Sequence, residues 1–268
     1  MAKVFDPIFE SHKRSRDELL QSILQSLEQD QRVVAAWLFG SLGSGIADYL
    51  SDIDIFVVIA DNHFEEVASA QKQFVTIPDT AMVTISAPQN APPEGAFLSV
   101  VYDTPTGAHI VDWYWQKQSR AKIPSDTKVL FDRVGIPPSG QPTGWEFPQP
   151  IPERTELEID ELYINASWYS IPRLAKYFAR SPWEKETPTE IIKSVKDLCD
   201  RFGAETPVFL WESYESPEVK LRFLNQLIDI SEGLLLSVKA RGVDVPQEIA
   251  PSVRRFLDIV GTYLKAKL

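Results

Sequence analysis

Two short polar motifs interrupt the apolar segments near the start of the chain. Gly40-Ser41 follows one apolar run, and Asp52-Ile53-Asp54 opens the next. Side chains alternate along a strand, so Asp52 and Asp54 are expected on one face and Ile53 on the other. Two neighbouring carboxylates repel each other, and a divalent cation between them removes that repulsion. An oxygen-only ligand set favours Mg²⁺ or Mn²⁺.

Gly40-Ser41 predicts a phosphate-binding turn. A glycine lets the backbone approach a phosphate closely, while backbone amides and the Ser41 hydroxyl can donate hydrogen bonds to it. Ser44, in the same glycine-rich loop, is a further candidate for phosphate binding. A phosphate site beside two metal-binding carboxylates is what nucleotidyl transfer requires, because metal ions bridge the phosphates and stabilise the attacking and leaving oxygens.

The two motifs and their spacing, with residues 42–51 between them, resemble the signature of the DNA polymerase β-like nucleotidyltransferase superfamily. Within it, the chain is similar to the stand-alone bacterial antibiotic nucleotidyltransferases of the aminoglycoside and lincosamide type. The resemblance implies a small mixed sheet with helices packed on one side. It also implies a helical second domain that helps to form the acceptor cleft, and ATP as the expected donor.

The resemblance further implies a third carboxylate on a later strand, and Asp112 fits that place. It stands in the otherwise apolar and aromatic segment 110–115, where an ordinary strand-end or surface residue is the alternative. We therefore expect Asp52, Asp54 and Asp112 to be the catalytic carboxylates and metal ligands. Asp112 is also a candidate for accepting the proton of the attacking hydroxyl.

The elements that position these residues predict an α+β fold of the α/β type. Strands are expected at 33–39, 53–60, 81–86, 97–102, 108–115 and 129–131. Helices are expected at 17–27, 64–74, around Pro172 within 156–180, at 191–202, from Ser216 onward and at 247–264. The predicted domains are a mixed-sheet nucleotidyltransferase domain (1–136), a proline-rich linker (137–153) and an all-helical substrate-binding domain (154–268).

Composition limits the partners. The net charge of −11 and the lack of a basic cluster argue against a nucleic-acid partner. No apolar run reaches the roughly 20 residues that span a bilayer, so no membrane association and a cytoplasmic location are expected. The one cysteine, Cys199, excludes an intrachain disulfide and a cysteine-based zinc site, and we interpret it as a buried thiol.

The expected function is Mg²⁺-dependent transfer of a nucleoside monophosphate, AMP from ATP, to a hydroxyl of a small molecule. An aminoglycoside-like antibiotic is one such acceptor, and the acidic run 153–161 favours a cation. The alternatives are an antitoxin-like or other protein-adenylylating enzyme, a non-catalytic nucleotide-binding protein, and RNA-directed transfer, which the charge disfavours. The acceptor, donor base, general base, oligomeric state and any role in antibiotic resistance stay open at this point.

Overall fold

The computed structural model describes residues 7–76, 80–144, 153–180, 186–208 and 216–266, without the side chains of 186–190. The predicted linker lies partly outside the described residues, because 145–152 are not among them. The chain divides into two compact units. The first is Met1–Pro105 with His109–Pro152, and the second is Thr106–Ala108 with Glu153–Leu268.

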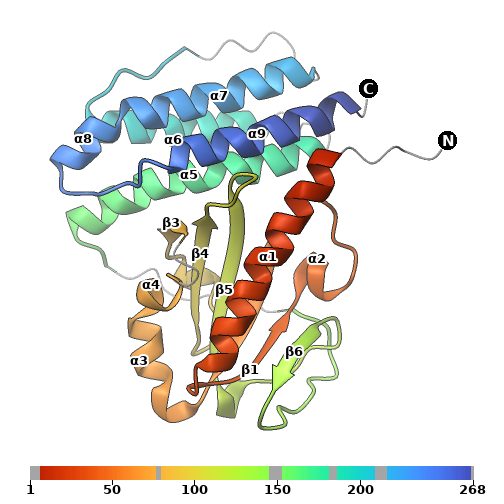
Figure 1. Ribbon diagram of the computed structural model, residues 1–268. Coiled ribbons are helices and arrows are strands. Elements are labelled where there is room, and N and C mark those ends of the chain that lie inside the picture. Colours follow the sequence, from red (N-terminus) through yellow and green to blue (C-terminus); the bar gives the residue numbers. More distant parts are fainter. Residues whose placement is uncertain (1–6, 77–79, 145–152, 181–185, 209–215, 267–268) are drawn as a thin grey trace. The chain divides into compact units, whose positions relative to one another are not determined.

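A six-stranded mixed sheet forms the centre of the first unit, with the strand order β3-β4-β5-β2-β1-β6 (Figure 1). The strands are β1 (Val33–Leu38), β2 (Ile53–Ile59), β3 (Ala81–Ile85), β4 (Ala96–Tyr102), β5 (His109–Lys117) and β6 (Lys128–Asp132). β2 and β5 pair in parallel, while the other neighbours pair antiparallel. The mixed sheet and the α+β class confirm the prediction.

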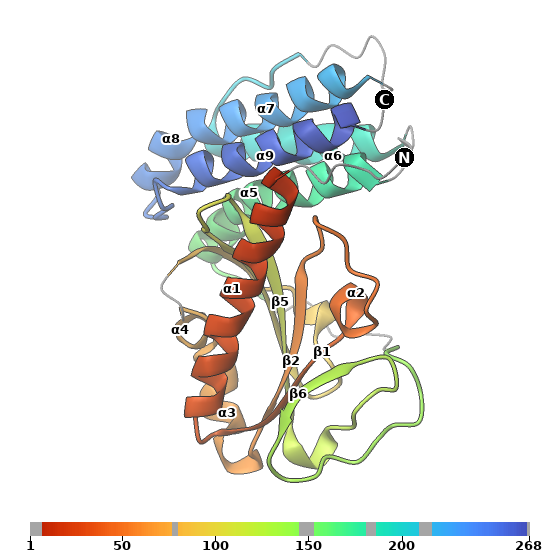
Figure 2. The same ribbon diagram turned by 45° about the vertical axis from the view of Figure 1, so that its right-hand side comes forward.

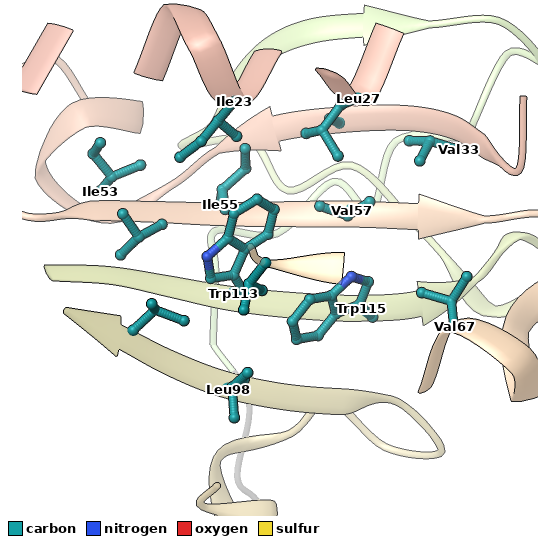
Figure 3. Close-up of a cluster of buried hydrophobic side chains, with 14 of the residues drawn as sticks. Ile23, Leu27, Val33, Ile53, Ile55, Val57, Val67, Leu98, Trp113 and Trp115 are labelled. Carbon is teal, nitrogen blue, oxygen red and sulfur yellow. The ribbon is translucent and has the colours of Figure 1, made fainter. Parts of the chain in front are cut away.

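Helices cover one face of this sheet. α1 (Pro7–Gln29), α3 (Phe64–Ser69) and α4 (Gln71–Phe74) lie together along it, as Figure 2 shows. Ile23 and Leu27 of α1 contact the sheet core beside Trp113 and Trp115, which are both buried (Figure 3). Packing of the helices on this apolar face stabilises the first unit, because burial of each large aliphatic or aromatic side chain contributes about 1.5–3 kcal/mol to folding.

Two helices of the first unit differ from their predicted extents. α1 begins ten residues before the predicted 17–27, at Pro7, because buried Phe9 and His12 extend its inward face by helical spacing. The segment predicted as one helix, 64–74, is two short helices. The backbone leaves helical geometry at Ala70, with φ −109° and ψ 26°, and so ends α3.

The second unit is helical. It contains α5 (Glu156–Arg180), α6 (Glu186–Phe202), α7 (Pro217–Gly233), α8 (Leu235–Ala240) and α9 (Ile249–Ala266). Buried residues of α5, α7 and α9 form its core, among them Trp168, Phe223 and Phe256. Pro172 lies inside α5, which continues through it as one helix where several helices around the proline were expected.

Cys199 is buried in α6, and this burial raises the pKa of its thiol, with Asp200 acting in the same direction. The interpretation as a buried thiol is confirmed. In the part of the chain that the structure describes, none of the helices combines the length and hydropathy that crossing a membrane requires.

Candidate active site

The sheet register places three site residues in one row across neighbouring strands. Ser99 of β4 pairs with Asp112 of β5, and Asp112 pairs with Asp54 of β2. Adjacent strands lie about 4.8 Å apart, and residues paired in register point to the same face. Asp54 and Asp112 therefore present half-buried carboxylates side by side, on the face opposite Ile55 and Trp113. Sequence alone could not provide this pairing.

Asp52 is the other member of the predicted carboxylate pair. It immediately precedes the strand and is half-buried like Asp54. Buried Ile53 between them belongs to the core of the other face, as the alternation predicts, while a shared face for Asp52 and Asp54 stays a prediction.

Gly40 lies directly against Asp54. The amide of Phe39 donates to the Asp54 carbonyl at 3.2 Å, which holds the end of β1 beside β2. A Cβ atom placed on Gly40 would lie 2.3 Å from Asp54 Oδ2, and Gly40 has φ +61°, a left-handed backbone that favours glycine. Gly40 is thus required both for its own conformation and for the position of the Asp54 carboxylate.

The predicted turn at Gly40-Ser41 is one helical turn, α2 (Gly40–Gly43). Ser41 is half-buried within it, and the exposed Ser44 donates its hydroxyl to the Gly40 carbonyl at 2.7 Å. A Cβ on Gly43 would lie 2.5 Å from the Leu38 carbonyl oxygen, so α2 packs closely on the end of β1. The glycine-rich loop indicated that a residue without a Cβ atom is needed at Gly43. The sequence did not show that the backbone it approaches is that of Leu38.

A buried arginine holds the loop between α2 and Asp52. Arg16 of α1 is 2% exposed, and its Nη1 donates to the Asp48 carbonyl at 2.9 Å. The Asp48 carboxylate accepts from the Leu50 amide and the Ser51 hydroxyl, both at 3.0 Å. Asp48 and Ser51 are therefore turn residues. Arg16 was not predicted, because a charged residue on an amphipathic helix normally faces solvent.

Replacing Arg16 by methionine should destabilise the first unit by about 1–3 kcal/mol, because the Asp48 carbonyl loses a donor in a partly buried place. Urea unfolding measures this loss. Arg14→Met on the exposed face of the same helix is the matched control and should be neutral. Equal stability of the two variants would show that Arg16 does not hold the loop.

The donor set suits a hard divalent cation, since the row offers carboxylate and hydroxyl oxygens and no sulfur or imidazole. Within the described ranges, no group of three or more His, Cys, Asp or Glu side chains is placed to hold a metal ion. The backbone register, and not a preformed ligand cluster, brings Asp54 and Asp112 together.

Tyr114 stands two residues after Asp112 in β5 and so shares its face of the sheet. Its ring makes edge contacts with Phe39 and Phe97, each at 4.8 Å between centroids. These contacts place Tyr114 in an aromatic cluster beside the carboxylate row. Asp132 accepts backbone hydrogen bonds from Val134, Gly135 and Ile136, which explains it as a structural residue.

Two carboxylates of the acidic run that begins the helical unit form ion pairs with arginines. Asp160 is only 5% exposed and forms ion pairs with Arg201 at 2.5 Å and Arg241 at 2.9 Å. Glu156 pairs with Arg201 at 2.8 Å, and Glu158 accepts hydrogen bonds from the Thr155 amide and hydroxyl at the start of α5. The expectation that this run attracts a cation therefore loses two of its carboxylates, Asp160 and Glu156, whereas Glu158 keeps its charge.

The helical unit also holds an open groove of about 540 Å³ between α5 and α6. Its lining is mainly apolar, with Leu162, Ile171 and Leu198 among the residues, and Ser167 and Ser170 add hydroxyls. Of the basic residues that recur along α5, Arg173 and Arg180 are exposed while Lys176 is buried, so they do not form one solvated stripe.

Comparison with known proteins bears on the first unit. Residues 21–94 match the family model described as "Polymerase beta, Nucleotidyltransferase". This match contains Gly40, Ser41, Asp52 and Asp54, and it ends before Asp112. A search of curated proteins gives no match.

Two solved structures resemble the chain distantly. One is the STING-associated c-di-GMP synthase CdnE from Capnocytophaga granulosa, at 15% identity over 97% of this chain and 83% of that chain, with a TM-score of 0.32. The other is the spectinomycin adenyltransferase AAD(9) from Enterococcus faecialis, solved with ATP and spectinomycin. It is 10% identical over 94% of this chain and 99% of that chain, with a TM-score of 0.23. At these values neither likeness bears on the substrate. The family match, together with the motif residues it contains, identifies a polymerase β-like nucleotidyltransferase domain in the first unit.

Proposed function

We propose that the chain transfers a nucleoside monophosphate, AMP from ATP, to a hydroxyl of a small molecule in a Mg²⁺-dependent reaction. The observation that supports this most is the register that pairs Asp54 with Asp112 beside Gly40. This register brings Asp112, the third predicted carboxylate, next to Asp54, against which Gly40 of the phosphate-binding motif lies. Transfer of a nucleoside monophosphate from a triphosphate donor needs both a phosphate site and closely spaced carboxylates.

In this proposal Asp52, Asp54 and Asp112 hold the divalent cation, with Mn²⁺ as an alternative to Mg²⁺. When bound, the cation would neutralise phosphate charge and stabilise the leaving oxygen. The Ser41 hydroxyl and the backbone amides after Gly40 bind the terminal phosphates of the donor, with Ser44 at the edge of that site.

Asp112 accepts the proton of the acceptor hydroxyl. The hydroxyl oxygen then forms a bond to the α-phosphorus, the bond from that phosphorus to the bridging oxygen breaks, and pyrophosphate leaves. The product is an acceptor that carries the nucleoside monophosphate through a phosphodiester bond.

We assign acceptor binding to the helical unit, with the groove between α5 and α6 as the candidate surface. Its volume of about 540 Å³ falls within the range of roughly 300–1,000 Å³ that is typical of small-molecule sites. The net charge of −11 still favours a cationic or neutral acceptor over a polyanion. Because Glu156 and Asp160 are paired with arginines, the preference for a cationic acceptor depends on the overall charge of the chain and not on the acidic run.

The direct test is an acceptor screen with α-labelled ATP and Mg²⁺, in which pyrophosphate release and labelled product are measured together. We expect both signals to require a small hydroxylated acceptor and to disappear with EDTA. For a cationic acceptor, KM should rise between low and physiological salt, where screening acts over about 8 Å. Label recovered on protein or RNA, or pyrophosphate formed equally well without Mg²⁺, would contradict the proposal.

A further inference from the structure

A buried serine stands beside the candidate catalytic carboxylate. Ser99 is 2% exposed in β4, a strand whose other residues are apolar or aromatic and buried throughout. A buried hydroxyl costs free energy unless it is hydrogen-bonded. Ser99 Oγ donates to Asp112 Oδ1, and the two residues are direct cross-strand partners. A hydroxyl in an otherwise apolar strand is thus explained by its contact with Asp112.

We propose that Ser99 is a positioning residue for Asp112, an inference that rests on the catalytic role proposed for this carboxylate. A hydrogen bond to an ionised acceptor is about twice as strong as one between neutral groups. Donation to Oδ1 restrains rotation of the carboxylate about its Cβ–Cγ bond. Asp112 is thereby held in one orientation before donor and acceptor bind, which lowers the entropic cost of reaching the reactive geometry.

The place of Ser99 in the sheet gives it a second effect. Asp112 has Ser99 as its partner on one side and Asp54 on the other. Two carboxylates on neighbouring strands repel each other, and a donor beside one of them offsets part of that repulsion. Ser99 therefore stabilises the arrangement of Asp54 and Asp112 that a divalent cation would use.

The first test compares Ser99→Ala with Ser99→Thr, which keeps the hydroxyl. Ser99→Ala should lower kcat by about 10- to 100-fold, because small misplacement of a reacting group has effects of that order. KM for ATP should change by less than about threefold, since the phosphate site at Gly40-Ser41 is intact. Ser99→Thr should recover most of kcat. Val100→Ala, the next residue on the opposite face of β4, controls for loss of strand stability.

A double-mutant cycle with Asp112→Asn separates positioning from a general effect on the fold. Mn²⁺ affinity, measured by electron paramagnetic resonance with a non-hydrolysable ATP analogue, is the readout, since Asp112→Asn is expected to be nearly inactive. Ser99→Ala should weaken Mn²⁺ binding several-fold when Asp112 is present and have little effect when it is absent.

The results distinguish this inference from the proposed function. Wild-type kcat and Mn²⁺ affinity in folded Ser99→Ala would overturn the positioning role, as would equal losses in both backgrounds of the cycle. Failure of the proposed function has a different signature, in which Asp112→Asn itself keeps wild-type turnover and wild-type Mn²⁺ affinity.

Discussion

Replacing Asp54 by asparagine should lower kcat by about 10³-fold or more while the protein stays folded. Asparagine keeps the shape of the side chain but removes the charge that binds a divalent cation, and metal-based stabilisation of the transition state amounts to several kcal/mol. Asp52→Asn should behave in the same way. Turnover with saturating ATP and Mg²⁺ measures the effect. A folded variant with near wild-type turnover would remove Asp54 from the metal site.

The free energy of unfolding gives a second readout for Asp54→Asn. Without bound metal, removing one of two neighbouring carboxylates relieves repulsion, so stability should be unchanged or higher. Asp61→Asn, beyond the opposite end of β2, is the matched control. Asp61 accepts a hydrogen bond from the Ser119 amide and is exposed, and its replacement should leave kcat unchanged. A large loss of stability in Asp54→Asn would instead indicate a structural carboxylate.

Replacing Gly40 by alanine should lower kcat by about 10²-fold or more, through the position of Asp54. The new Cβ would lie 2.3 Å from Asp54 Oδ2, a separation that atoms cannot adopt, so the carboxylate must move. A displacement of about 1 Å at a catalytic group costs roughly 10² in rate. The positive φ of Gly40 adds about 1–2 kcal/mol of backbone strain for an L-residue.

Gly135→Ala separates these two effects. Gly135 also has positive φ, at +75°, but a Cβ there meets nothing within 4 Å. It should therefore lose a similar amount of stability in urea unfolding while keeping wild-type kcat. If Gly40→Ala and Gly135→Ala lose the same stability and both retain turnover, the close approach of Gly40 to Asp54 has no role in catalysis.

Several site features were predictable because they depend on neighbours in the sequence. Alternation in β2 put Ile53 in the core and Asp54 on the other face, because side chains of successive strand residues point to opposite faces. The Asp48 carboxylate likewise accepts hydrogen bonds from the Leu50 amide and the Ser51 hydroxyl, two and three residues ahead. Such interactions form within a few residues, so residue type and spacing are sufficient to predict them.

Other features depend on which distant segments pack together. Asp54 and Asp112 meet because β2 and β5 pair in parallel, in the register that buries Ile55 and Trp113 on the opposite face. Arg16 is buried because the carbonyl that it binds belongs to a loop 32 residues away. The amphipathic pattern of the helix predicts an exposed position for a charged residue such as Arg16, and it cannot indicate a hydrogen-bond partner as distant in the sequence as Asp48.

The chain's own sequence determined the residue types of the site, their spacing and the strands that carry them. The tertiary structure decided that Ser99 donates to Asp112, that Gly40 lies against Asp54, and that Asp160 is neutralised by two arginines. The physical reason is the range of the interactions. Backbone alternation and turn formation are local, whereas strand register and ion pairing between helices are set by burial of apolar surface across the whole unit.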